Sequence, residues 1–129
     1  MRIIGYGIDT VCESRIERFL KSRERWAEGI FSPAERELAG DPATHAAFFA
    51  GRFAGKEAVA KALGTGFAGG VTVHVIEILR LPSAAPCVRL SGGALDRAAQ
   101  LGITGSFISI THCRGVATAS AIAVADGTS

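Results

Sequence analysis

The spacing of apolar residues changes twice in the first third of the chain. At residues 2–10, β-branched side chains interleaved with glycine predict a strand, with Asp9 near its C-terminal end. Between residues 12 and 30, apolar positions recur every three or four residues, which predicts an amphipathic helix. Ser32, Pro33 and Glu35 form the pattern of a capping box with proline at the first helical position, so a short helix is expected from there to Gly40.

A long helix at residues 43–63 dominates the rest of the chain, since this stretch is rich in alanine and phenylalanine and has no internal proline. Gly51 and Gly55 inside it indicate close backbone approach, because each costs about 1 kcal/mol relative to alanine. Beyond it the pattern predicts a glycine-rich loop (64–70), two strands (71–79 and 87–90), a helix (91–102) and a hairpin of two strands (106–111 and 116–124). Helices and strands do not alternate regularly, so this order favours an α+β domain over a parallel α/β fold.

Composition fits one folded domain. The chain has 129 residues, 48% of them hydrophobic and 20% charged, which predicts a single domain over residues 1–129. Its longest apolar run, residues 116–125, has about half the length that a membrane-spanning helix needs. Asp9 and Glu13 interrupt the N-terminal apolar stretch where a secretory signal would have its apolar core. We therefore expect neither a membrane partner nor export.

Charge and cysteine spacing exclude two further classes of protein. The net charge of +2 is too small for a protein that binds nucleic acid through bulk charge. Cys12, Cys87 and Cys113 are odd in number and form no C-x-x-C pair, which argues against a zinc site and against a disulfide framework. We therefore expect reduced thiols in a cytoplasmic protein.

Three segments carry the candidate chemistry. They are GYGID at residues 5–9, RFAGKEAVAKALGTG at residues 52–66 and SITH at residues 109–112. With these segments in this order and spacing, the chain resembles the holo-acyl-carrier-protein synthase family of 4′-phosphopantetheinyl transferases. The resemblance implies that family's small α+β fold, in which an antiparallel sheet packs against a long helix.

Asp9 and Glu57 are the candidate metal ligands. From the residues alone, Asp9 can equally be a turn or cap residue, and Glu57 can equally form a surface ion pair with Lys61 four positions on. A strand-end carboxylate and a helix carboxylate can also converge on Mg²⁺, which takes one or two protein carboxylates and completes its shell with water and phosphate oxygens. The resemblance implies the metal site. Lys61, on the same helical face as Glu57, then reaches the bound phosphates and joins Asp9 and Glu57 in the catalytic set.

The resemblance also implies contacts to coenzyme A from the long helix, the loop after it and the hairpin. The candidate coenzyme-binding residues are Lys56, Lys61, Gly64, Thr65, Gly66 and His112. Lys56 points about 100° away from Glu57, so contact with solvent alone is the alternative for it. Ordinary helix termination is the alternative for Gly64, and a surface or capping role is the alternative for His112.

An arginine-bearing face of the first helix is the candidate docking surface for an acidic carrier protein. The resemblance places such contacts early in this helix, at Arg15 and more loosely at Arg18 and Arg23. The intervening glutamates leave the stretch only weakly positive, so a solvated polar face is the alternative.

The implied reaction transfers 4′-phosphopantetheine from coenzyme A to a serine of an apo acyl carrier protein and releases adenosine 3′,5′-bisphosphate, in support of fatty acid or polyketide synthesis. Glu57, or a metal-bound water that it orients, would accept the serine proton. The family's members are homotrimers with active sites between subunits. Two other functions stay open from the residues: a non-catalytic module that binds a nucleotide or an acidic protein, and another Mg²⁺-dependent enzyme that processes diphosphates.

Overall fold

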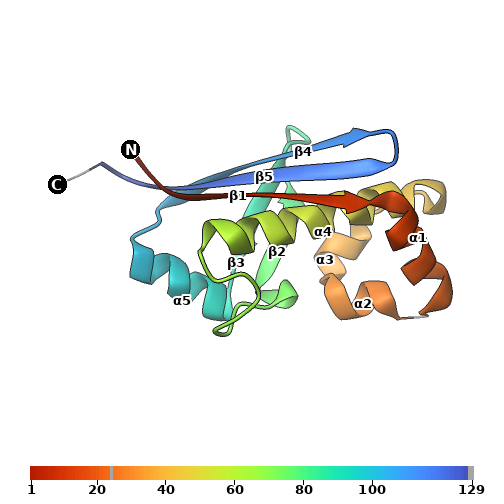
Figure 1. The fold of residues 1–129 in the computed structure, drawn as a ribbon, viewed down its shortest axis with the longest axis horizontal. Coiled ribbons are helices and arrows are strands. Elements are labelled where there is room, and N and C mark those ends of the chain that lie inside the picture. The colour runs from red at the N-terminus through yellow and green to blue at the C-terminus, as the bar shows by residue number, and fades with distance from the viewer. Residues whose placement is uncertain (24, 128–129) are drawn as a thin grey trace.

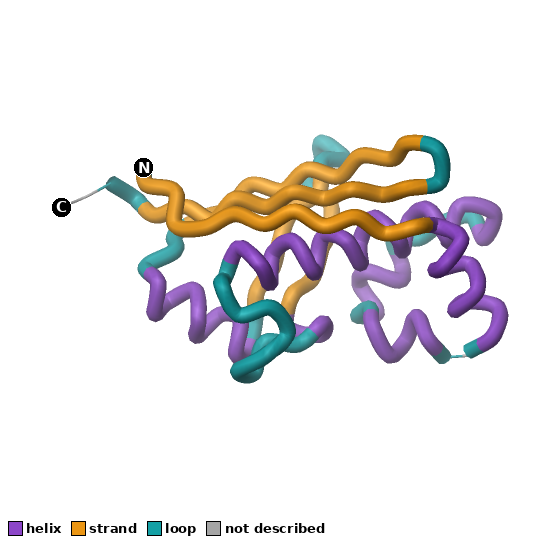
Figure 2. Tube along the Cα trace, in the orientation of Figure 1, coloured by secondary structure: helices purple, strands orange, loops and turns teal. Residues whose placement is uncertain are grey.

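A three-stranded antiparallel sheet lies across one long helix in the computed structural model, which describes residues 1–23 and 25–127 (Figures 1 and 2). In chain order the elements are β1 (Arg2–Cys12), α1 (Glu13–Ser22), α2 (Trp26–Ile30), α3 (Pro33–Glu37), the 3₁₀ turn η1 (Pro42–Thr44), α4 (His45–Ala62), the 3₁₀ turn η2 (Val73–Val75), β2 (Ile76–Arg80), β3 (Pro86–Leu90), α5 (Gly92–Leu101), β4 (Gly105–Cys113) and β5 (Val116–Ala125). The α+β fold with an antiparallel sheet packed against a long helix is confirmed.

The sheet has the strand order β1-β5-β4, so the first strand of the chain pairs with the last. Side chains alternate between its two faces, as the period of two in a strand requires. Along β5 the alternating residues Ala117, Ala119, Ala121 and Ala123 are buried against α4, whereas the residues between them face outward. The opposite face of the sheet is not covered by any helix in the described part of the chain (Figure 1).

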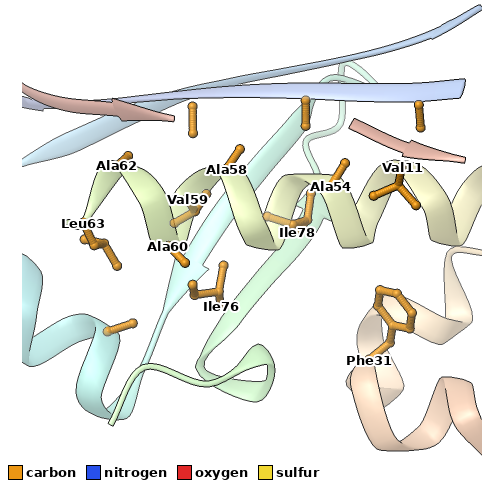
Figure 3. Packing of buried hydrophobic residues seen from close by; sticks show 14 of the residues in the cluster. Val11, Phe31, Ala54, Ala58, Val59, Ala60, Ala62, Leu63, Ile76 and Ile78 are labelled. Carbon is orange, nitrogen blue, oxygen red and sulfur yellow. The ribbon is translucent and has the colours of Figure 1, made fainter. Parts of the chain in front are cut away.

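Small residues let α4 lie close beneath the sheet. Ala54, Ala58 and Ala62 point from α4 toward the strands (Figure 3), and all three are at most 6% exposed. On β1, a Cβ atom at Gly7 would lie 2.1 Å from the carbonyl oxygen of Ala58, so only glycine permits this approach. We call this close contact of β1 with α4 at Gly7 the β1–α4 seam. Asp9, two residues after Gly7 on the same face of the strand, therefore lies over the same helix.

A second, two-stranded sheet contacts α4 through β2 and the larger sheet through β3 against β4, and α5 lies at the end of the molecule opposite α1 and α2 (Figures 1 and 2). Ile76 and Ile78 of β2 are fully buried against α4. The α5 helix ends at Gly102, whose φ of 74° is the left-handed conformation that glycine supplies at helix ends.

Two predicted elements differ from the structure. The helix expected over residues 12–30 is divided into α1 and α2, because Arg23 adopts an extended conformation (φ −127°, ψ 101°) after Ser22; residue 24 lies outside the described residues. The strand expected over residues 71–79 begins only at Ile76, because residues 73–75 form η2 and the carbonyl group of Val73 accepts a hydrogen bond from Lys56.

The other predicted elements are confirmed with small shifts of their ends. The capping box of α3 is present: the Ser32 hydroxyl accepts from the Glu35 N–H, and the Glu35 carboxylate accepts from the Ser32 N–H. Among the helices formed by residues 1–23 and 25–127, none combines the length and the apolar character needed to cross a membrane.

Candidate active site

Asp9 and Lys61 face each other across the seam between β1 and α4. The Lys61 ammonium donates to Asp9 Oδ1 at 3.2 Å and to the carbonyl oxygen of Ile8 at 2.9 Å. The Asp9 side chain is 17% exposed and the Lys61 side chain 50% exposed, so this pair lies where the seam opens to solvent. An ion pair between Lys61 and Glu57 was the alternative interpretation from the sequence; the structure pairs Lys61 with Asp9 instead.

Glu57 lies one helical turn before Lys61 and is half-buried. Burial raises the pKa of its carboxyl group, and the negative charge of Asp9 raises that pKa further, while the charges of Lys61 and Arg15 oppose the shift. Among the ion pairs of the described residues, none includes Glu57. The structure therefore brings two carboxylates together and leaves one of them without a neutralising partner.

This arrangement fits a magnesium ion. The Asp9 and Glu57 oxygens are hard donors, and the Asp9 charge, which adds to burial in raising the Glu57 pKa, is one that a cation between the carboxylates would offset. Within residues 1–23 and 25–127 no group of three acidic, histidine or cysteine side chains gathers at one point. Two carboxylates are the number that Mg²⁺ accepts when substrate phosphates and water complete its shell.

Lys56 is not brought to this site, which corrects its predicted role as a coenzyme contact. Its side chain is fully buried, and its ammonium donates to Glu35 Oε1 at 2.8 Å and to the carbonyl oxygens of Val73 and Ile76. All three donors of the ammonium are thereby used. Neither coenzyme nor solvent can reach Lys56 without opening the core, so the alternative of contact with solvent fails as well.

His112 lies elsewhere on the sheet. His112 of β4 pairs with Ala117 of β5, and Ala117 pairs on its other side with Val11 of β1. His112 is therefore separated from β1 by one strand and is in register with Val11, two residues after Asp9. Its ring covers Gly51 of α4, where an added Cβ atom would lie 3.2 Å from the ring, and its Nδ1 is 3.4 Å from Glu13 Oε1. Within one chain, no contact joins His112 to Asp9, Glu57 or Lys61 in the described structure.

The loop after α4 is built for helix termination. The N–H groups of Gly64 and Gly66 donate to the carbonyl oxygens of Lys61 and Ala60, at 2.9 and 3.1 Å. Both glycines have positive φ, 79° and 56°. The structure therefore favours the alternative of helix termination for Gly64, and the N–H groups of both glycines are already used. The Thr65 hydroxyl donates to the carbonyl oxygen of Gly66, so a coenzyme contact there would have to compete with this bond.

The candidate docking residues differ in their relation to the carboxylates. Arg15 lies close enough to Glu57 to lower its pKa, which connects the arginine face of α1 with the site. Arg15 and Arg23 both stack on Phe19, at 5.5 and 5.3 Å from the ring centre. Arg18 is exposed on α1, and no interaction relates its side chain to the carboxylates.

Arg52 is a candidate that the sequence reasoning missed. Its Nε is buried without a hydrogen-bond partner in the described residues, and its guanidinium lies 4.5 Å from the Phe48 ring centre. Burial lowers its pKa, and the nearby charge of Arg80 lowers it further. The signal was present in the sequence, because an arginine beside Gly51 in an otherwise apolar stretch of the longest helix is unusual for a core-facing segment.

Comparison with known proteins identifies similar chains. The family model described as the 4′-phosphopantetheinyl transferase superfamily matches residues 5–122. The holo-[acyl-carrier-protein] synthase of Maridesulfovibrio salexigens is 52% identical over 120 residues, which cover 91% of this chain and 94% of that protein. The protein of the same name from Solidesulfovibrio magneticus is 47% identical over 127 residues, covering 97% of this chain and 99% of that one.

Solved structures have the same fold. The Helicobacter pylori holo-[acyl-carrier-protein] synthase in complex with coenzyme A superposes with a TM-score of 0.80 at 32% identity, covering 92% of this chain and 99% of that one. The Bacillus anthracis holo-(acyl-carrier-protein) synthase, in complex with CoA (3′,5′-ADP), superposes with a TM-score of 0.79 at 30% identity, covering 96% of this chain and 98% of that one.

Proposed function

This chain belongs to the 4′-phosphopantetheinyl transferase superfamily, and we propose on that basis that it transfers 4′-phosphopantetheine from coenzyme A to a serine of an apo acyl carrier protein, with Mg²⁺ held by Asp9 and Glu57. The observation that carries the assignment is the juxtaposition of the two carboxylates on β1 and α4, with the Lys61 ammonium beside them. Relatives that share at least 47% of the sequence over almost the whole chain bear the name of this activity.

The reaction is an in-line displacement at the pantetheine-side phosphorus of coenzyme A. A bond forms between the serine oxygen of the carrier and this phosphorus, and the bond from phosphorus to the bridging oxygen breaks. The electron pair of the broken bond leaves with adenosine 3′,5′-bisphosphate. A magnesium ion, when bound, supplies positive charge next to the diphosphate.

The chain's own residues position the charges for this step. Asp9 and Glu57 provide the oxygen ligands, and the half-exposed Lys61 ammonium, once it leaves Asp9, can contact a diphosphate oxygen whose negative charge grows. Glu57, or a metal-bound water that it orients, is placed beside the diphosphate to take the serine proton.

Carrier docking is assigned to the arginine face of α1. Acyl carrier proteins are acidic, and Arg15 adjoins the carboxylate pair, which supports it as the contact that brings the carrier serine to the site. Arg23 stacks with Arg15 on Phe19 and extends the same positive surface, and exposed Arg18 lies between them in sequence. Electrostatic attraction of this kind acts mainly on the rate of encounter and on specificity.

We also assign a homotrimer with sites between subunits. The support is the uncovered face of the β1-β5-β4 sheet, where Tyr6, Ile122 and Phe107 form one row across three strands. They are 71%, 36% and 57% exposed, and apolar rows of this size on a sheet favour burial against another chain. A neighbouring copy would then supply His112 to the coenzyme phosphates at this chain's carboxylates, which accounts for its distance from Asp9 within one chain.

The cellular setting is assigned to the cytoplasm. All three cysteines are free thiols in the structure, and Cys12 and Cys113 are exposed. Exposed free thiols persist in a reducing compartment, which supports this assignment.

Intact-mass spectrometry of apo acyl carrier protein, incubated with the chain, coenzyme A and Mg²⁺, tests the proposal. We expect a mass gain of one phosphopantetheine arm that is abolished by EDTA and by Asp9→Asn. The matched control is Asp96→Asn, since Asp96 is an exposed aspartate on α5 outside the site. No gain on any carrier from folded protein would favour a binding module, and a gain that survives EDTA would refute the metal assignment.

A further inference from the structure

A fully buried ion pair includes Lys56, the residue before Glu57 in the sequence. Lys56 of α4 and Glu35 of α3 are both 0% exposed, and their charged atoms are 2.8 Å apart. Glu35 Oε1 also accepts from the Ser32 N–H at 2.9 Å, and its Oε2 accepts from the Ile78 N–H of β2 at 2.8 Å. Phe31 covers the lysine, with its ring centre 5.4 Å from the ammonium. One pair thus connects α3, α4 and β2.

A buried ion pair of this kind needs an explanation other than stability. Removing two charges from water is costly, and apolar residues of similar volume are often as stabilising at such positions. Every donor of Lys56 has an acceptor here, and Glu35 accepts three hydrogen bonds, so the charged atoms of both residues are fully hydrogen-bonded. Directional bonds in a core fix orientation, which non-directional apolar contact does not.

The alanine contacts between α4 and the sheet do little to fix the orientation of the helix. Toward the sheet, α4 presents Ala54, Ala58 and Ala62 against the buried alanines of β5 (Figure 3). Contacts between methyl groups bury area but do not interlock, so they resist rotation of the helix about its axis only weakly. The glycines of β1 set how near the helix lies, and not how it is turned.

We propose that the buried Lys56–Glu35 pair is a positioning device that fixes the rotation of α4 and thereby sets the separation of the Asp9 and Glu57 carboxylates for divalent-cation binding. This inference rests on the proposed function, because it takes those carboxylates as the metal ligands. Lys56 and Glu57 are successive residues about 100° apart on the helix, so bonds that hold Lys56 on one side orient Glu57 on the next.

The geometry gives the scale of the effect. Side chains end about 5–6 Å from a helix axis, so a rotation of about 20° moves the Glu57 carboxylate by about 2 Å. Magnesium demands oxygen ligands at about 2.0–2.1 Å in near-ideal octahedral geometry. A displacement of this size would remove one of the two carboxylate ligands.

The test compares cation affinity with fold stability. A single substitution leaves an uncompensated buried charge and is prone to unfold the chain, so the main variant is the neutral double substitution Glu35→Gln/Lys56→Met. Ser32→Ala is the milder second variant, because it leaves both charges of the pair in place and removes the hydroxyl that caps α3 beside Glu35 and donates to Glu77. Ile103→Ala serves as the control, since it destabilises the core beside β3 and β4 without touching the pair.

Mn²⁺, which takes similar oxygen ligands, is titrated into each folded variant and free Mn²⁺ is measured by electron paramagnetic resonance. We expect the double variant to bind Mn²⁺ about tenfold more weakly than the parent chain, Ser32→Ala to lie between them, and Ile103→Ala to match the parent. In the transfer assay the Mg²⁺ concentration for half-maximal rate should rise by the same factor, while the rate at saturating Mg²⁺ recovers.

The possible outcomes separate the two proposals. Parent-like Mn²⁺ affinity in the folded variants would overturn the positioning role and leave the proposed function intact. Equal loss of affinity in Ile103→Ala would also overturn it, because general destabilisation would then explain the effect. If the parent chain itself binds no Mn²⁺, the metal assignment fails first, and the positioning role fails with it. If the double variant does not fold, the affinity of Ser32→Ala decides.

Discussion

The close contact between β1 and α4 predicts that a larger residue at Gly7 lowers both stability and activity. Replacing Gly7 with alanine adds one methyl group, whose carbon would lie 2.1 Å from the carbonyl oxygen of Ala58 and 2.7 Å from the Lys61 Cβ. Ordinary contact begins at about 3.5 Å between non-bonded carbon atoms. The closest atom belongs to the backbone of α4, so it cannot rotate away, and the helix must move from the strand by about 1 Å.

The expected cost follows from this displacement. Overpacking of a core costs about 1–3 kcal/mol. Part of this cost is offset because alanine has less conformational entropy than glycine in the unfolded chain. We therefore expect Gly7→Ala to lower the free energy of unfolding by about 2 kcal/mol, which leaves a chain of ordinary stability folded. Glu57 and Lys61 flank Ala58 on α4 and move with it, and a misplacement of about 1 Å reduces kcat/KM by about 100-fold.

Two measurements check the two parts of this prediction. Urea unfolding can be followed by the fluorescence of Trp26, the single tryptophan, which packs against Phe19, Phe31 and Phe53. Transfer to the carrier is measured by intact mass. Gly29→Ala is the matched control: it adds the same methyl group in α2, where nothing lies within 4 Å, and should stabilise the chain slightly. If Gly7→Ala unfolds and turns over like the parent chain, close contact at this seam does not position the site.

Three further predictions concern the carboxylates, the carrier and the sheet. Burial and Asp9 raise the pKa of Glu57 in the folded state, so the stability that protonated Glu57 contributes below its unfolded pKa is lost as pH rises through its folded pKa. Without metal, Glu57→Gln should therefore be more stable than the parent chain at pH 7, by less than about 1 kcal/mol. Below about pH 4 the two proteins should be equally stable in thermal unfolding. Arg15→Glu should raise KM for the carrier several-fold, because an exposed ion pair contributes up to about 1 kcal/mol and reversal makes it repulsive. An unchanged KM would exclude Arg15 from docking. Tyr6→Lys should convert a trimer to monomer in light scattering and abolish transfer; a trimer that survives would exclude this face of the sheet as the interface.

Local patterns and the family resemblance contributed differently to the sequence-based prediction. The helix motif around Glu57 is long and specific, the strand motif around Asp9 is weak alone and was singled out through the resemblance, and the capping box of α3 could be predicted because its residues act on their own backbone. Lys56 could not be interpreted in this way. In sequence it adjoins Glu57, yet its ammonium belongs to a buried network with Glu35 and η2, residues 21 and 17 positions away.

The sequence by itself determined which elements form, since the period of apolar residues and the glycines and caps at their ends act over a few residues. Only the tertiary structure decided which partner each charge takes. Lys61 forms its ion pair with Asp9, 52 positions away, and not with Glu57 on its own helix, because the close contact at Gly7 brings β1 onto α4. Pairing across the fold depends on how helix and sheet pack, and that packing rests on many weak contacts between residues far apart in the chain.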